Sequence, residues 1–191
     1  PDAVSTPWAA ITSTGHVVAG EKVAVFGVGG LGIHAVQLLK IIGASVIAID
    51  PREDARSNAL ARGADFAFAP DDALLKKHRG LNAVFDFAGV SPVRKQALSM
   101  LGEQGRLVIV GIANEPIVIP NDMAFTYMRT QIMGHYGSEA HHVRELIELA
   151  ASGRLDLSHS VSEVLPLESA GDALDKLANK VGNPIRIVLK P

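Results

Sequence analysis

Residues 22–50 read KVAVFGVGGLGIHAVQLLKIIGASVIAID, and they set the architecture of the chain. Val23 to Phe26 is a short apolar run, typical of a strand that is buried on both faces. Residues 31–42 place apolar side chains at helical spacing, and Val46 to Ile49 is a second apolar run that ends at Asp50. The order of strand, glycine turn, helix and strand predicts one β-α-β unit with parallel strands.

The glycines of this stretch follow the first strand with the spacing Gly-x-Gly-x-x-Gly. Gly27 allows a tight turn, Gly29 lets the backbone approach a pyrophosphate, and Gly32 lets the helix pack closely on the sheet. The helix then directs N–H groups and a positive dipole end at the phosphates. Asp50 lies about 20 residues further on, where a carboxylate binds an adenosine ribose. This complete context favours a dinucleotide site over a turn without a ligand.

Composition excludes several other classes of function. The formal net charge is −2 without a long basic run, which gives no indication of a nucleic-acid or membrane partner. No apolar stretch is long enough to cross a bilayer and no signal peptide is visible, so we expect a cytoplasmic protein. The absence of cysteine excludes disulfides and thiolate metal sites within these 191 residues.

Strands and helices alternate along the rest of the chain, which predicts an α/β fold: a doubly wound parallel sheet (Rossmann fold) with helices on both faces. A helix that begins at Pro7, with Ser5 or Thr6 as its cap, is expected before the first strand. The helix at 138–152 is expected to bury one apolar face. That face consists of Val143, Leu146, Ile147 and Ala150. The further strands are expected at 66–69, 83–87, 106–110, 130–134, 161–165 and 185–189, and the further helices at 52–62, 71–78, 92–101, 122–129 and 170–177.

Several fragments, in order, resemble the zinc-dependent medium-chain alcohol dehydrogenases. They are 27–32, 43–50, 62–65, 85–89, 105–111, 165–167 and 185–189. The resemblance covers nearly the whole chain but not the amino-terminal catalytic domain that holds zinc in that family. It implies a connecting helix from that domain at 1–20, a dinucleotide-binding domain at 21–153, and a segment returning towards the catalytic domain at 154–191.

The resemblance also implies roles for particular residues. Thr6 and Leu31 contact the nicotinamide ring in this interpretation, and Arg186 reaches the pyrophosphate. Val110, Ile112, His135 and Gly137 lie in the strands that form the carboxamide-binding edge. The predicted cofactor-binding set is Thr6, Gly27, Gly29, Gly30, Leu31, Gly32, Asp50, Val110, Ile112, Gly137 and Arg186. No catalytic residue is predicted within the chain.

The cofactor implied is NAD, because Asp50 would repel a 2′-phosphate, whereas Arg52 could instead help to hold the 2′-phosphate of NADP. The seven histidines show no metal-ligand spacing, so no metal is expected in this chain, and zinc belongs to the catalytic domain. The resemblance implies hydride transfer between an alcohol and NAD in the whole enzyme, with the isolated chain inactive. A non-catalytic dinucleotide-sensing or interaction module and an NADP-dependent quinone reductase relative are the alternatives.

The strand expected at 130–134 would be an exposed sheet edge, which invites association. In the resembling family dimers form by joining sheets at this edge. We therefore expect an isologous homodimer.

Overall fold

The computed structural model describes residues 2–179, 181–182 and 184–191. The chain divides into two compact units, residues 1–147 and 148–191. The first unit is built around a six-stranded sheet, and the second contains a two-stranded sheet.

The larger sheet has the strand order β3-β2-β1-β4-β5-β6, and every neighbouring pair is parallel. Its strands are β1 (Lys22–Phe26), β2 (Ser45–Ile49), β3 (Phe66–Phe68), β4 (Leu81–Asp86), β5 (Leu101–Ile109) and β6 (Gln131–Gly134). Successive strands run outward in one direction from β1 to β3 and in the other from β4 to β6. This order confirms the predicted doubly wound sheet, with its switch point between β1 and β4.

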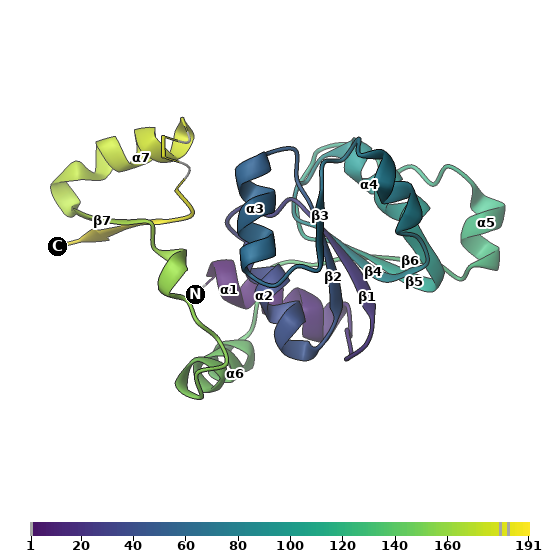
Figure 1. Ribbon diagram of the computed structural model, residues 1–191, viewed down its shortest axis with the longest axis horizontal. Helices are drawn as coiled ribbons and strands as arrows, with labels where there is room; N and C mark the ends of the chain where they lie inside the picture. Colours follow the sequence, from purple (N-terminus) through teal and green to yellow (C-terminus); the bar gives the residue numbers. More distant parts are fainter. Residues whose placement is uncertain (1, 180, 183) are drawn as a thin grey trace. The chain divides into compact units, whose positions relative to one another are not determined.

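Helices cover both faces of this sheet (Figure 1). The helices of the first unit are α1 (Asp2–Ala9), the π-helix η1 (Ala10–Thr14), α2 (Gly32–Ile42), α3 (Glu53–Ala61), the 3₁₀-helix η2 (Ala73–Lys77), α4 (Ser91–Met100), α5 (Asp122–Tyr127) and α6 (Ala140–Ala151), which continues into the second unit. Figure 1 shows α2 and α3 on one side of the strands and α4 on the other. Within the described part of the chain, no helix combines the length and apolar character needed to span a membrane.

Strand β1 is buried on both faces because its side chains alternate between two layers. Ala24 and Phe26 belong to one apolar cluster with Val93 and Ala97 of α4. Val25 points to the other face, where its side chain lies near Gly32 of α2. All the residues from Val23 to Phe26 are 0% exposed. A continuous apolar run rather than an alternating one is what such a central parallel strand requires.

The second unit pairs β7 (Glu163–Pro166) with β8 (Ile187–Lys190) in parallel. The crossover between them contains the 3₁₀-helix η4 (Leu167–Ser169) and α7 (Ala170–Ala178), and a further 3₁₀-helix, η3 (Ser158–Ser160), precedes β7. Lys176 of α7 donates to both carboxylate oxygens of Glu163, at 2.8 and 2.9 Å, and so ties the crossover to its first strand.

The first helix corrects a prediction. It begins at Asp2 rather than at Pro7, and Pro7 lies inside it. The Thr6 hydroxyl donates to the Asp2 carboxylate at 2.7 Å, so Asp2 supports the first turn that the prediction assigned to Ser5 or Thr6. The helix then widens into η1, which ends at Thr14 with Gly15 as its cap.

Two further expectations differ from the structure. Strand β5 begins at Leu101, five residues earlier than predicted, because an irregular turn at 102–105 is accommodated within it: Leu81 pairs with Leu101, and Ala83 with Arg106. In α6, Leu146 is buried but Ile147 is 60% exposed. The predicted apolar face is therefore wrong by part of a turn, since His142 rather than Ile147 shares the buried side with Leu146.

The turn after β1 depends on backbone that packs against backbone. Gly27 has a backbone φ of +81°, which residues with a side chain rarely adopt. A Cβ atom on Gly32 would lie 1.9 Å from the Gly27 carbonyl oxygen. The beginning of α2 therefore lies directly against the end of β1, as the third glycine of the motif predicts.

We expect Gly32→Ala to lower the free energy of unfolding by about 3 kcal/mol, because either the helix or the glycine turn must shift to admit the methyl group. Chemical denaturation measures this loss. Gly171→Ala is the control, since a Cβ there meets nothing within 4 Å and the position is helical. Equal stabilities of the Gly32→Ala variant and the parent would contradict the close packing.

Candidate cofactor site

A cleft of about 580 Å³ opens at the carboxyl ends of β1, β2 and β4, at the switch point of the sheet. Its walls are the glycine turn after β1, the residues that follow β2, and the beginning of α4 with the exit of β5. The lining residues are Phe26, Gly27, Gly29, Gly30, Leu31, Gly32, Ile49, Asp50, Pro51, Arg52, Pro70, Phe87, Ala88, Val90, Pro92, Val93, Gln96, Val110 and Gly111. Ligands of open α/β sheets bind at this position.

The amino terminus of α2 faces this cleft without a side-chain cap. Leu31 occupies the cap position and makes no capping hydrogen bond, and no acidic residue stands in the first turn. The first N–H groups of a helix need partners, and an anionic ligand supplies them where no cap does. His34, which is 0% exposed, donates from Nδ1 to the Gly30 carbonyl at 2.9 Å and so helps to fix the glycine turn.

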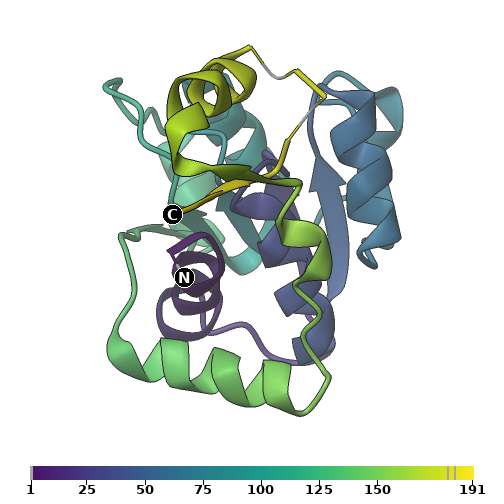
Figure 2. The same cartoon turned by 90° about the vertical axis from the view of Figure 1, so that its left-hand side faces the viewer.

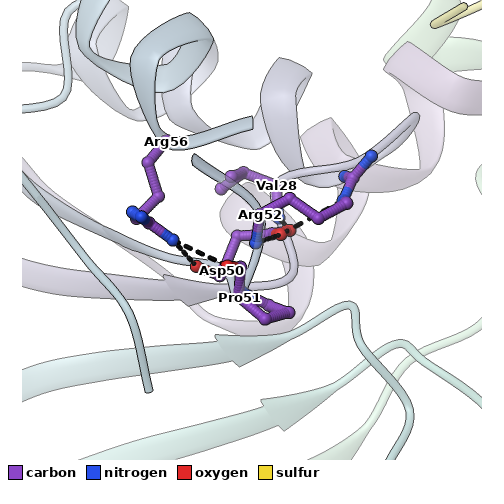
Figure 3. A network of polar contacts seen from close by, with 5 residues as sticks. All are labelled: Val28, Asp50, Pro51, Arg52 and Arg56. Atoms are coloured by element: carbon purple, nitrogen blue, oxygen red, sulfur yellow. Dashed lines mark hydrogen bonds and ion pairs between the residues drawn. The ribbon is translucent and has the colours of Figure 1, made fainter. Parts of the chain in front are cut away.

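Asp50 joins the glycine turn to the end of β2 (Figure 3). One carboxylate oxygen accepts the Val28 N–H at 3.0 Å, and the other accepts the Arg52 backbone N–H at 2.9 Å. Arg52 Nε lies 3.3 Å from that second oxygen. Asp50 is only 4% exposed, yet it lines the cleft. Because a carboxylate offers about four acceptor sites, these three contacts leave capacity for about one ribose hydroxyl, and for a second if Arg52 Nε is displaced.

Two arginines follow Asp50, and they have different roles. Arg56 donates from Nη1 to the backbone carbonyls of Asp50 and Pro51, at 2.9 and 2.8 Å, and holds the chain as it leaves β2. Arg52 extends away from Arg56 (Figure 3) and lines the cleft. Its Nη2 lies 3.8 Å from the position that a Cβ of Gly29 would occupy. A cation therefore stands beside the glycine turn, where phosphates are expected.

Sequence analysis missed an ion pair behind the opposite wall of the cleft. Asp86, at the end of β4, and Arg94 of α4 lie 3.2 Å apart, with side chains 0% and 6% exposed. Asp86 is the last residue of β4, and Asp50 directly follows β2, so this shared position at a strand end could have marked Asp86. Arg94 carried no comparable signal, because a charged residue in a helix usually indicates an exposed face.

Three other predicted residues, Thr6, Ile112 and Gly137, belong to the first unit but do not line this cleft. Thr6 is 5% exposed in α1, and Ile112 is 82% exposed beyond β5. Neither these two nor Gly137 is among the described residues that line the cleft. Arg186 belongs to the second unit, and its contact with a pyrophosphate stays a prediction. The roles assigned to Thr6, Ile112 and Gly137 likewise stay predictions.

Helix α1 and its π-helical extension lie beside the segment that follows β6 (Figure 2). Side chains join them at several points: Ser138 donates to Ser5 at 2.8 Å, Trp8 Nε1 donates to Glu145 at 2.6 Å, and Ser13 bonds His142 at 2.8 Å. The segments that carry Thr6 and Gly137 are therefore held together, although they are more than a hundred residues apart in sequence.

His135 is the centre of this contact. Its Nε2 donates to the Gly137 carbonyl at 3.0 Å, so in the neutral ring Nδ1 accepts from the Thr14 hydroxyl at 2.8 Å. Burial lowers the pKa of His135 below its usual 6.5 and outweighs hydrogen bonds to the backbone of Gly137 and Thr6, which raise it. The folded protein therefore favours the neutral imidazole.

Comparison with known proteins finds a matching family and similar enzymes. The family model described as zinc-binding dehydrogenase matches residues 30–152. An alcohol dehydrogenase of Geobacillus stearothermophilus is 32% identical over 177 residues, which cover 90% of this chain and 51% of that protein. An NAD-dependent alcohol dehydrogenase of Sulfolobus acidocaldarius is 32% identical over 154 residues, covering 78% and 44%. The chain spans about half the length of the curated relatives it matches.

Solved structures agree with the sequence comparison. The crystal structure of the alcohol dehydrogenase from the archaeon Aeropyrum pernix superimposes with a TM-score of 0.85 at 31% identity. The match covers 100% of this chain and 56% of that one. The fold of the present chain is thus that of one part of a larger dehydrogenase.

The lowered pKa of His135 predicts a loss of stability in mild acid. Below about pH 6.5 the unfolded chain binds a proton at His135 more readily than the folded chain does, so stability falls as the pH drops towards the folded pKa. Thermal unfolding at about pH 7.5 and about pH 5.5 measures the effect, and His135→Asn should reduce the difference between the two. His16→Asn, at an exposed residue, should leave the difference unchanged. An identical pH dependence of the parent and the His135→Asn variant would refute this assignment.

Proposed function

Because the chain belongs to the zinc-binding dehydrogenase family, we propose that it holds NAD in the cleft between β1 and β4 for an alcohol dehydrogenase. In the whole enzyme a hydride would pass between an alcohol and the nicotinamide. The observation that carries the proposal is the position of Asp50, whose carboxylate lines the cleft while it accepts the N–H of Val28 in the glycine turn.

The chain's own groups suit the three parts of a dinucleotide. Asp50 would accept the adenosine ribose hydroxyls. The uncapped amino terminus of α2 and the backbone at Gly29 would hold the pyrophosphate, because a glycine has no side chain of its own to keep the ligand from the backbone. Leu31 and Val110 line the remaining part of the cleft, where the nicotinamide would lie. When bound, the nicotinamide accepts or delivers the hydride.

Zinc does not fit the described part of this chain. Among residues 2–179, 181–182 and 184–191, no group of three or more His, Cys, Asp or Glu side chains is arranged to hold a metal, and the sequence contains no cysteine. We therefore assign only cofactor binding to these residues. Zinc would be bound in a separate catalytic domain, with residues 1–20 and 154–191 connecting to it and 21–153 forming the dinucleotide-binding domain.

A second candidate cofactor is NADP, which the Asp50–Arg52 ion pair favours. The adenosine 2′-phosphate of NADP would bind next to the ribose, close to Asp50. The pairing with Arg52 offsets part of the repulsion by the carboxylate, and a guanidinium is suited to a phosphate. NAD remains the first choice because the Asp50 carboxylate lines the same cleft. The cytoplasmic location stays a prediction. The non-catalytic dinucleotide-sensing module stays an alternative function.

Calorimetric titration with NAD, and separately with NADP, tests the proposal. We expect Asp50→Ala to weaken NAD binding at least about tenfold, since hydrogen bonds to a charged group are lost. Asp50→Asn should weaken it less, because the amide oxygen can still accept the Val28 N–H. Asp175→Ala, at an exposed acid in α7, should have no effect. Binding of neither dinucleotide by the parent chain would contradict the proposal.

The same titration separates the two cofactors. If Arg52 holds a 2′-phosphate, Arg52→Ala should weaken NADP about tenfold and NAD much less, because only NADP loses a charged hydrogen bond. Tighter binding of NADP than of NAD by the parent chain would overturn the choice of NAD.

We also propose an isologous dimer through β6. In the described sheet β6 is an edge strand, and nearby Tyr127 of α5 and Tyr136 are 79% and 90% exposed. An unpaired edge flanked by exposed aromatic groups favours association. We expect solution scattering to give twice the mass of one chain, whereas a monodisperse monomer at high concentration would argue against the dimer.

A further inference from the structure

Arg94 connects two acceptors behind the cleft. Its Nε lies 3.2 Å from the Asp86 carboxylate, and its Nη2 donates to the Gly111 carbonyl at 3.2 Å. The other oxygen of Asp86 accepts the Gly89 N–H at 2.9 Å. One guanidinium therefore ties the end of β4, the turn that follows it and the exit of β5 into a single network.

The backbone at this place is packed as closely as at the glycine turn after β1. The carbonyl of Asp86 accepts the N–H groups of Val110 and Gly111, at 2.9 and 2.7 Å. A Cβ on Gly111 would lie 2.3 Å from the Gly89 nitrogen. The two turns thus lie in contact, and the position of Gly111 depends on the groups that hold it to Asp86 and Arg94.

Val110 and Gly111 line the cleft, whereas Arg94 lines a neighbouring hollow and is buried behind them. A dinucleotide crosses the switch point of a doubly wound sheet. Asp50 marks the adenosine end on the β2 side, so the exit of β5, on the other side of β1, faces the nicotinamide half. Arg94 would therefore act on the ligand only through the backbone that it holds.

We propose that Arg94 is a positioning residue that fixes the backbone at 110–111 for the nicotinamide half of the cofactor. This inference rests on the proposed cofactor binding and adds a residue outside the cleft to it. An arginine is required because its planar fork reaches Asp86 and Gly111 at the same time, whereas a lysine has a single ammonium group.

The test compares two ligands that differ only in the part concerned. ADP-ribose carries the adenosine, the pyrophosphate and the second ribose of NAD but no nicotinamide. We expect Arg94→Lys to weaken NAD about tenfold in calorimetric titration, and ADP-ribose less than about twofold, because the adenosine wall is untouched. Lys95→Met, at the exposed neighbour in α4, should change neither affinity.

Arg94→Lys is the main variant because it keeps a positive charge beside the buried Asp86, whereas Arg94→Met leaves that carboxylate without its partner. Amide hydrogen exchange gives a second measurement that needs no ligand. In Arg94→Lys we expect faster exchange at Gly111 and Gly89, and unchanged exchange at Val28, where Asp50 holds the turn.

The outcomes are distinguishable. Equal losses of affinity for NAD and ADP-ribose would make Arg94 a support of the whole cleft and overturn the inference, as would unchanged affinity for both or unchanged exchange at Gly111. Failure of the parent chain to bind either ligand would instead refute the proposed function, and the inference with it.

Discussion

The cleft depends on the close contact of backbone with backbone at the carboxyl ends of β1, β4 and β5. Gly32 lies against the carbonyl of Gly27, Gly27 against Ala88, and Gly111 against Gly89. A side chain at any of the glycines in these contacts would separate two turns that both line or support the cleft. The hydrogen bonds that Asp50 and Asp86 accept from the N–H groups of Val28 and Gly89 then help to fix these turns. The packing at the carboxyl ends of these strands therefore also shapes the protein surface that would face a ligand.

Much of the fold could be predicted from the sequence because central parallel strands are marked by continuous apolar runs. Residues 23–26 and 46–49 were identified in this way, and the structure confirms them as β1 and β2. The predictions failed where a local signal had two meanings. Pro7 suits the first turn of a helix, but in the structure the helix begins at Asp2 and Pro7 lies inside it. Gly102 does follow the end of α4 at Met100, but the strand expected from residue 106 already begins at Leu101 and includes this glycine.

The sequence motif predicted the wall of the cleft that contains the glycine turn and Asp50. It did not predict the groups behind the opposite wall, at the ends of β4 and β5. One cleft is lined by six of the residues that the motif singled out for cofactor binding. They are Gly27, Gly29, Gly30, Leu31, Gly32 and Asp50. Arg94 could not be found from sequence, because its function follows from the register that brings Gly111 beside Asp86. In the same way His142 lies on the buried side of α6 because Ser13, 129 residues away, supplies its partner. Such polar pairs join residues that are far apart in the chain, so no repeating pattern in the local sequence reveals them.

The two acid–arginine pairs show how similar elements can have different roles. Asp50 and Asp86 each end a strand, each accept an N–H from the turn beside the cleft, and each face an arginine at 3.3 or 3.2 Å. The Arg52 side chain is 39% exposed, whereas that of Arg94 is 6% exposed. Asp50 is buried, but its exposed arginine can exchange partners at little cost, whereas the pair of Asp86 and Arg94 is buried on both sides and costly to break. Asp50 can therefore give up its contact with the Arg52 guanidinium in favour of a ligand and still accept the Val28 N–H. Asp86 cannot, and its effect on a ligand has to pass through the backbone that it holds in place.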